Sequence, residues 1–305
     1  SHPRRWRTLE FADHPGPFVL WRCRMCGYVW NHPRLSDEAL ADQYGADYYV
    51  FEQPAERRWQ RAVQLYDTLL LPRGEGLPGG RLLDIGCSQG ELLALARERG
   101  WRVEGLELLP DSARLARQRY GLKVHVGAIE ERASALPLFD VVLAADVIEH
   151  VPSPRAFVSS IRRVLNPDGY AIIETPNFGG FWRRVSGANW LGYNRFHIQL
   201  FDANTLSHLL TRCGLRECRC IGSTNAVHTQ LAHRPELASW TRRLPAGLEW
   251  RFNRMLQRVS ATTESPRIDS LKAAVSRVAR VKRGRESLTP TSLLRCDNIA
   301  AIARG

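Results

Sequence analysis

The sequence predicts an α/β fold in which helices cover both faces of a mostly parallel sheet. Short apolar stretches of strand character alternate with helical stretches between residues 81 and 222. The loops between them are short, which favours parallel strands joined by right-handed crossovers. The stretches VVLAA and YAIIE are apolar along their whole length, as expected for strands that are buried on both faces.

The expected elements follow in chain order. A helix over 53–71 comes first, and the turn-rich stretch 72–80 separates it from the core. The expected strands are 81–85, 101–106, 123–126, 139–144, 170–175, 215–221 and a last one within 292–303. The expected helices are 91–99, 110–120, 154–165 and 203–213, and either Asp202 or Asn204 caps the last one. The first fifty residues look irregular.

The chain divides into four expected parts. Residues 1–52 form an N-terminal aromatic segment, 53–230 the core, 231–290 a helical insertion between strands six and seven, and 291–305 the final core strand. The whole chain carries a net charge of +12. The insertion holds 13 Lys and Arg against 5 Asp and Glu, so much of this charge is concentrated there. It could be a lid over the substrate, a dimer arm or a solvated surface.

The most informative motif is the run Leu82-Leu83-Asp84-Ile85-Gly86-Cys87-Ser88-Gln89-Gly90. A buried strand leads into a glycine loop, where the missing Cβ atoms let a ligand approach the backbone. Such a ligand lies at the carboxyl edge of the sheet. Glycine spacing alone also fits a dinucleotide site, but the Asp84 carboxylate would repel a pyrophosphate. It favours S-adenosylmethionine, which carries an ammonium and a sulfonium group and no phosphate.

This run resembles motif I of the class I S-adenosylmethionine-dependent methyltransferases, LDIGCGxG, with Ser88 in place of the middle glycine. Glu107 lies 21 residues after Gly86, at the end of the second strand, where an acid can accept both ribose hydroxyls. The resemblance implies a Rossmann-like sheet of seven strands. The expected cofactor-binding residues are Asp84, Gly86, Cys87, Ser88, Gly90, Glu107, Leu108, Ile129 and Ala145.

Further blocks carry the same resemblance along about half of the chain. Residues 139–151 are similar to the FDxVxxxxVLEHV block of small-molecule methyltransferases, a group related to the ubiquinone-biosynthesis O-methyltransferases. Gly127-Ala128-Ile129-Glu130 is expected beside the adenine. Asn166-Pro167-Asp168-Gly169 matches a family turn, and Glu174-Thr175-Pro176-Asn177 matches a family strand end.

Methyl transfer to a hydroxyl needs an aligned acceptor and a group that removes its proton. The candidate bases are His197 and His150, with His228 as a third. His197 lies in a loop after strand five, on the expected substrate side, where its alternative role is to order the loop. An amine acceptor needs less help from a base, so all three histidines could be positional. We assign no metal ligand among these residues.

Cys23 and Cys26 form a CxxC that resembles the second half of a zinc ribbon found at the N-terminus of some methyltransferases. A structural zinc needs four ligands, usually from two such pairs. No cysteine precedes Cys23, although His14 and His32 could substitute. The segment is therefore either a zinc site of unusual composition or a degenerate ribbon.

We therefore expect transfer of a methyl group from S-adenosylmethionine, by in-line displacement, to a hydroxyl or amine of a sugar, lipid-linked or natural-product acceptor. The alternatives are an RNA methyltransferase, suggested by the charge, and a non-catalytic binding module that keeps the cofactor fold. Ala145-Asp146-Val147-Ile148 offers no ring on which a base could stack, which disfavours nucleic acid.

The expected partner is a small molecule, which could be anionic or lipid-linked. Peripheral membrane contact and the choice between monomer and homodimer stay open. The chain has seven cysteines, an odd number, and no apolar run like that of a signal peptide or a span of about 20 residues. We therefore expect a cytoplasmic protein.

Overall fold

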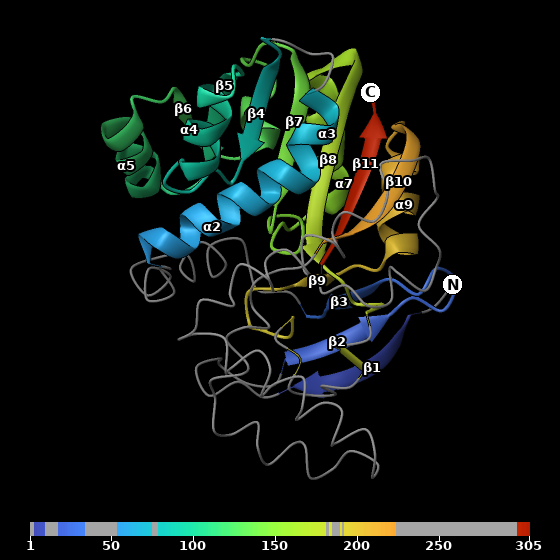
Figure 1. Ribbon diagram of the computed structural model, residues 1–305. Coiled ribbons are helices and arrows are strands. Elements are labelled where there is room, and N and C mark those ends of the chain that lie inside the picture. The colour runs from blue at the N-terminus through green and yellow to red at the C-terminus, as the bar shows by residue number, and fades with distance from the viewer. Residues whose placement is uncertain are drawn as a thin grey trace, which may run out of the picture. The chain divides into compact units, whose positions relative to one another are not determined.

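The structure is a computed structural model that describes residues 3–9, 18–33, 54–74, 79–180, 183–184, 190, 192–223 and 298–305. Its larger sheet has seven strands in the order β10-β11-β8-β7-β4-β5-β6 (Figure 1). These strands are β4 (Arg81–Ile85), β5 (Arg102–Glu107), β6 (Val124–Val126), β7 (Phe139–Ala145), β8 (Leu165–Pro176), β10 (Arg216–Ser223) and β11 (Asn298–Arg304). The strands from β6 to β8 run parallel, whereas β11 is antiparallel to both of its neighbours.

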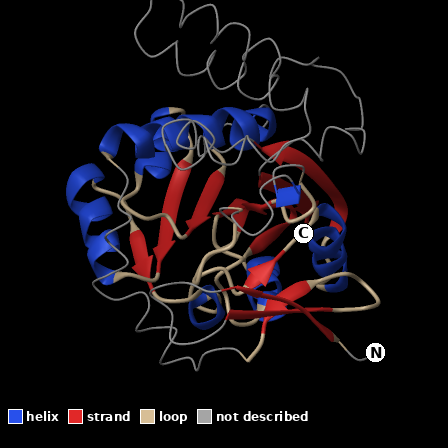
Figure 2. Cartoon of the chain, turned by 90° about the horizontal axis from the view of Figure 1, so that it is seen from below, coloured by secondary structure: helices blue, strands red, loops and turns tan. Residues whose placement is uncertain are grey.

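Helices cover both faces of this sheet because its strands alternate apolar side chains between two cores. Leu82 packs in one core and Leu83 in the other, and Ile172 and Ile173 divide in the same way. Figure 2 shows helices on both sides of the central strands. The helices and helical turns are α2 (Ala55–Leu65), the π-helical η2 (Tyr66–Leu70), α3 (Leu71–Gly74), α4 (Glu91–Glu98), α5 (Pro110–Tyr120), α6 (Ile129–Arg132), α7 (Pro154–Arg163) and α9 (Ala203–Arg212). The predicted Rossmann-like sheet is confirmed.

One predicted turn is built differently. The stretch 166–169 was expected to separate a helix from a strand, but it lies within β8. Leu165 already pairs with Phe139, and the next aligned pair is Val141 with Tyr170. The four residues between Leu165 and Tyr170 therefore form an irregularity in the strand rather than a separate turn.

The N-terminal segment contains regular structure that the sequence analysis missed. The strands β1 (Arg4–Leu9), β2 (Phe18–Arg22) and β3 (Val29–Asn31) form an antiparallel sheet with β9 (Gln199–Leu200). The prediction of an irregular segment was wrong because these strands are short and β3 pairs with a strand far along the chain. A bridge between Asn177 and Phe201 attaches this small sheet to the end of β8.

The predicted insertion at 231–290 lies outside the described residues. Residues 224–297 connect β10 to β11, and these strands pair with each other up to Ser223 and Asn298. In the described part of the chain, no helix is long and apolar enough to cross a bilayer.

The start of α9 resolves the choice between its two predicted caps. The Asp202 carboxylate accepts a hydrogen bond of 2.8 Å from the backbone N–H of Thr205, and the Thr205 hydroxyl accepts one of 2.9 Å from the backbone N–H of Asp202. This reciprocal pair satisfies two N–H groups that the helix leaves open. Asn204 is exposed on the first turn.

Replacing the Asp202 side chain should therefore destabilise the fold, whereas the same change at Asn204 should not. We expect Asp202→Ala to lower the free energy of unfolding by about 0.5–2 kcal/mol. Asn204→Ala is the matched control and should change it by less than about 0.5 kcal/mol. Urea denaturation followed by circular dichroism measures both. Equal losses in the two variants would contradict the assignment of the cap.

Candidate functional site

The glycine loop between β4 and α4 adopts a backbone that explains its composition. Gly86 and Gly90 have φ angles of +74° and +92°, and Ser88 has a φ of +48°. A Cβ on Gly86 would lie 2.6 Å from the Cγ2 atom of Val147, which is in the loop after β7. The two loops therefore meet at the carboxyl edge of the sheet.

Glu107 ends β5 and holds the glycine loop in place. Its carboxylate accepts hydrogen bonds from the backbone N–H groups of Ser88, at 2.8 Å, and Leu109, at 2.9 Å. A carboxylate offers about four acceptor sites, so about two remain for further donors. Burial raises the pKa of Glu107, although the backbone N–H groups oppose this shift.

Asp84 lies next to Glu107 and is equally buried. Its side chain is 5% exposed, and no hydrogen bond or ion pair joins it to the described residues. Burial, followed by the negative charge of Glu107, raises the pKa of Asp84 to about 8. The site thus contains two desolvated carboxyl groups without a cation from the described part of the chain.

These features fit S-adenosylmethionine. A ligand with a positive charge would relieve the repulsion between the two carboxyl groups, and the spare acceptor sites of Glu107 suit a pair of hydroxyls. Gly86 and Ser88 are exposed, so their backbone is accessible to a ligand beside these carboxyl groups. Asp84, Glu107, Gly86 and Ser88 are brought together by the fold, as the sequence analysis expected.

The other predicted cofactor residues occupy more varied places. Cys87 is buried against Gly105, where a Cβ would lie 2.6 Å from the Cys87 sulfur. Leu108 is 53% exposed beside Glu107 and is available for contact with a ligand. Ile129 begins α6 but is only 1% exposed, because it packs in the core. Ala145 ends β7 and is half-buried.

Sequence reasoning missed Arg61, which connects α2 to the ends of two strands. Its guanidinium bonds to the Asp146 carboxylate at 2.9 Å and to the fully buried Glu174 carboxylate. Asn298 donates a hydrogen bond of 3.2 Å to Asp146, which has a φ of +55°. These contacts fix the loop after β7. The predicted helix over 53–71 included Arg61, but nothing in the sequence indicated its partners.

The fold places the two principal candidate bases side by side. The rings of His150 and His197 lie 4.7 Å apart, centre to centre, in an edge-to-face arrangement. The Nδ1 atom of His150 is 3.0 Å from the carbonyl oxygen of Phe196, and that of His197 is 2.9 Å from the carbonyl oxygen of Gly192. Burial lowers the pKa of His150 to about 3 and that of His197 to about 4, so both rings are neutral at pH 7. His228 lies outside the described residues.

Glu149 completes a compact group with these histidines. Its Oε2 atom accepts a hydrogen bond of 2.9 Å from the Thr175 hydroxyl, and its Oε1 atom is buried without a hydrogen-bond partner. Each histidine Nε2 atom lies 4.0 Å from Oε1. Burial and the negative charge of Asp146 raise the pKa of Glu149 well above its ordinary value. The sequence analysis assigned no role to Glu149.

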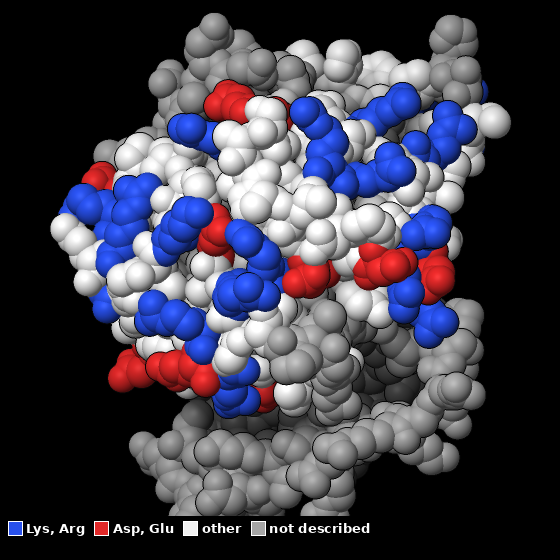
Figure 3. All heavy atoms as spheres, turned by 90° about the horizontal axis from the view of Figure 1, so that it is seen from above, with Lys and Arg blue, Asp and Glu red and all other residues white. Residues whose placement is uncertain are grey.

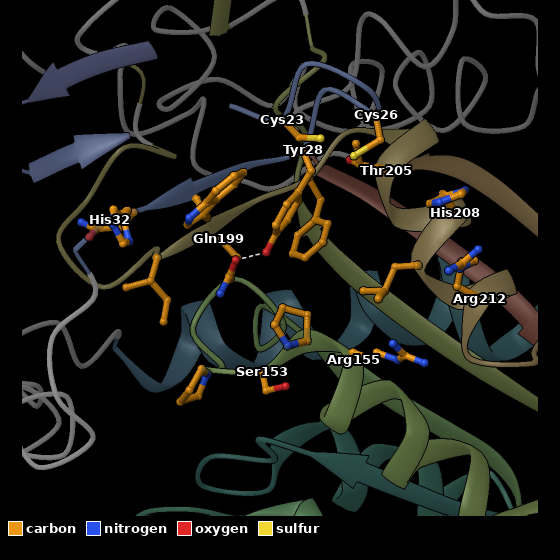
Figure 4. A pocket seen from close by; sticks show the side chains of 17 residues that line it. Cys23, Cys26, Tyr28, His32, Ser153, Arg155, Gln199, Thr205, His208 and Arg212 are labelled. Atoms are coloured by element: carbon orange, nitrogen blue, oxygen red, sulfur yellow. Dashed lines mark hydrogen bonds between the residues drawn. The ribbon is translucent and has the colours of Figure 1, made fainter. Parts of the chain in front are cut away.

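Cys23 and Cys26 lie in the turn between β2 and β3, and within the described residues they join no further metal-ligating side chain. Both line a cavity of about 670 Å³ that also contains Tyr28, Arg155, His208 and Arg212 (Figure 4). None of the predicted catalytic or cofactor-binding residues lines this cavity. Its lining does include Ile198, which follows His197, and Gln199, whose backbone N–H donates to the carbonyl oxygen of Glu149, so the cavity borders the candidate site.

On the face of the described part that Figure 3 shows, positive side chains are spread out rather than gathered in one patch. Figure 3 shows Lys and Arg side chains across the face seen from above, together with a smaller number of Asp and Glu. Some of these charges pair with each other, as Arg304 does with Glu217 at 3.3 Å and Arg114 with Asp111 at 3.1 Å. This distribution is typical of a solvated surface.

Comparisons with known proteins agree with this geometry. A family model described as "Methyltransferase domain" matches residues 52–217. The ubiquinone biosynthesis O-methyltransferase of Aromatoleum aromaticum is 33% identical over 174 residues, which cover 53% of this chain and 74% of that enzyme. The enzyme of the same name from Idiomarina loihiensis is 37% identical over 109 residues, or 34% of this chain. The chain spans only 45–50% of the length of several such relatives.

Solved structures show the same fold. A SAM-dependent methyltransferase from Archaeoglobus fulgidus superposes with a TM-score of 0.51 at 18% identity, covering 85% of this chain and 99% of that one. A putative sarcosine dimethylglycine methyltransferase from Galdieria sulphuraria gives 0.50 at 16% identity, covering 80% and 85%. At these identities the likeness concerns the fold alone.

The raised pKa of Asp84 predicts a stability that depends on pH. The pKa of about 8 in the folded protein exceeds the ordinary value of 3.8, so the folded protein keeps a proton that the unfolded chain loses. Stability therefore falls as the pH rises between about 4 and 8. Because asparagine stays neutral, we expect Asp84→Asn to raise the melting temperature of the cofactor-free protein, by more at pH 8 than at pH 5.

Differential scanning calorimetry at the two pH values measures this effect. Asp111→Asn is the control, because it removes a carboxylate from a side chain that is 66% exposed rather than buried. A lower melting temperature of Asp84→Asn at both pH values would contradict the desolvation of Asp84.

Proposed function

Because the chain belongs to the class I S-adenosylmethionine-dependent methyltransferases, we propose that it transfers a methyl group from this cofactor to a hydroxyl of a small molecule. The family match over 52–217 confirms the resemblance found in the sequence, including the cofactor. The pair of buried carboxyl groups, Asp84 and Glu107, is the observation that best supports cofactor binding at the carboxyl edge of the sheet.

The residues around the loop have distinct proposed roles. Glu107 accepts hydrogen bonds from the two ribose hydroxyls with the acceptor sites that its backbone partners leave open. Asp84 balances the positive charge of the cofactor, and the exposed backbone of Gly86 and Ser88 lies against it. Gly90 is buried, and its missing Cβ makes room for Leu122 and Ala116. Leu108 covers an apolar part of the cofactor, because its side chain is exposed directly after Glu107.

A hydroxyl is the acceptor that the comparisons favour. The curated relatives described above are named O-methyltransferases, and the name refers to an oxygen acceptor in those proteins. In this chain the neighbouring polar group consists of two neutral imidazoles and a carboxyl group, which suits a hydroxyl as a hydrogen-bond donor. The acceptor would then lie beside the loop after β7, at the carboxyl edge of the sheet.

The cofactor supplies an electrophilic methyl group that a nucleophile attacks in line with the departing sulfur. The chain has to orient the acceptor oxygen, exclude water and handle the hydroxyl proton. The Nε2 atom of His197 or His150 can accept a hydrogen bond from this hydroxyl. With pKa values of about 4 and about 3, however, neither ring is a strong base. Full removal of the proton needs further stabilisation of the oxygen anion.

Incubation with S-adenosylmethionine labelled in its methyl group tests the acceptor. A phenol, a sugar and a lipid-linked alcohol are offered beside the corresponding amines and transfer RNA. Label in a hydroxyl compound supports the proposal. Label only in an amine or in RNA contradicts the acceptor, and cofactor binding without any transfer supports a non-catalytic module.

The proposed role of Glu107 predicts a loss of cofactor affinity when its carboxylate is removed. Hydrogen bonds to a charged acceptor contribute about 1.5–3 kcal/mol, so Glu107→Ala should raise the dissociation constant by about ten- to a hundredfold. Titration calorimetry with S-adenosylmethionine measures it. Glu104→Ala on the same strand is the control and should leave the affinity unchanged, because Glu104 pairs with Arg81 and Lys123 instead. Unaltered binding by a folded Glu107→Ala protein would exclude this role.

A further inference from the structure

We propose that the cavity between the small N-terminal sheet and the helices α7 and α9 binds a small amphipathic anion, a molecule with an apolar or aromatic body and one anionic group. The cavity has a volume of about 670 Å³. Sites for small molecules are concave, with volumes of roughly 300–1,000 Å³, mostly apolar walls and a few polar groups that set the orientation of the ligand. This cavity has that size, and its lining divides into an apolar part and a positively charged part (Figure 4).

Three aromatic rings form much of the apolar part. The rings of Tyr28 and Trp30 are stacked, with their centres 5.6 Å apart, and the Tyr28 ring lies 5.4 Å from that of Phe201. Tyr28 and Trp30 are only half-buried although they stack on each other. Aliphatic surface is added by Pro152, Ile198 and Leu209. Walls of this kind favour an apolar or aromatic body, because its surface is removed from water and can pack against the rings.

The positively charged part lies on one side of the cavity. Figure 4 shows the side chains of Arg155, His208 and Arg212 on this side. Arg155 belongs to the first turn of α7, and the other two lie one turn apart on α9. The Cys213 thiol, directly after Arg212, donates a hydrogen bond of 3.8 Å to the carbonyl oxygen of Arg155 and so connects the two helices. All three cavity residues are exposed, so the cavity is open to solvent on this side.

The two arginines have no negative partner in the described part of the chain. None of the described residues that line the cavity is Asp or Glu, and neither Arg155 nor Arg212 forms an ion pair with a described residue. By contrast, the exposed Arg114 pairs with Asp111 at 3.1 Å. Two cations without an acid create a positive potential that attracts an anion. A planar guanidinium group matches the paired oxygens of a carboxylate or a phosphate.

Gln199 connects the cavity to the candidate site. Its side-chain oxygen accepts a hydrogen bond from the Tyr28 hydroxyl within the cavity (Figure 4). Its side-chain nitrogen donates to the carbonyl oxygen of Val151 at 3.3 Å, and its backbone N–H donates to that of Glu149 at 3.0 Å. None of the predicted cofactor-binding or catalytic residues lines the cavity. The anion would therefore be a ligand distinct from the cofactor, bound against the strand that follows His197.

Calorimetric titration of the full chain with naphthalene derivatives tests the charge and the body of the ligand. Naphthyl phosphate and naphthoate carry an anion on an aromatic body, naphthylmethylamine carries a cation on the same body, and inorganic phosphate is the anion alone. We expect one molecule of an aromatic anion to bind per chain. The amine and inorganic phosphate should bind at least about tenfold more weakly, because each lacks one of the two features. The tighter of the two aromatic anions identifies the preferred anionic group.

Replacing both arginines tests where the anion binds. Hydrogen bonds that involve a charged group are stronger than neutral ones, so Arg155→Gln combined with Arg212→Gln should raise the dissociation constant of the aromatic anions by about tenfold or more. The matched control combines Arg97→Gln with Arg163→Gln, which removes the same charge from two exposed arginines outside the cavity. This control should leave the affinity unchanged. Melting curves show whether each variant is folded.

Repeating the titrations with saturating S-adenosylmethionine distinguishes the cavity from the cofactor site. The aromatic anions should still bind. Loss of their binding under this condition would overturn the proposed anion site. Three other results would do the same, namely no saturable binding of either aromatic anion, equal binding of the amine, or an unchanged affinity after both cavity arginines are replaced. Anion binding by a chain that does not bind S-adenosylmethionine would sustain the anion site and count against the proposed function.

Discussion

The burial of carboxyl groups at one edge of the sheet is the constraint on which the rest of the site depends. Four buried acids lie near the ends of β4, β5, β7 and β8, namely Asp84, Glu107, Glu149 and Glu174. A charge removed from water is costly unless an opposite charge or several donors lie beside it. Within the described residues, Glu174 has such a partner in Arg61, and Glu107 has backbone donors.

The architecture explains why these acids gather in one place. Both faces of the sheet are covered, because the strands send successive apolar side chains into two separate cores. The parallel strands all end at the same edge, so only the loops there can present polar groups to a ligand. A cationic cofactor suits this negative region.

The sequence was sufficient to predict the strands and helices whose signals come from neighbouring residues in the chain. The predicted limits of β4 and α5 are those of the structure, since an apolar strand with a glycine loop and a helix ended by Gly121 leave a clear signal. The strands β1 to β3 were missed, because their burial depends on packing against residues such as Phe178, Trp190 and Leu200 that lie far along the chain.

The site likewise contains residues that could be located from the sequence and residues that could not. Asp84 and Glu107 could be located from motif spacing, since they end neighbouring strands. The contact between His150 and His197 could not, because it spans two loops that only the folded sheet brings together. The partners of Arg61 lie 85 and 113 residues away, and a sequence pattern does not reveal contacts at that separation. The unpartnered oxygen of Glu149 likewise follows from tertiary packing alone.

The pairing of Ser223 with Asn298 has a consequence for how this family member could diversify. The 74 residues from 224 to 297 leave and re-enter the sheet at directly opposed positions of neighbouring strands. The entropy of closing a flexible loop grows only with the logarithm of its length, so lengthening such a loop from four residues to 74 costs about 2–3 kcal/mol. Segments of very different length can therefore be exchanged at this junction while the register of β10 and β11 is kept.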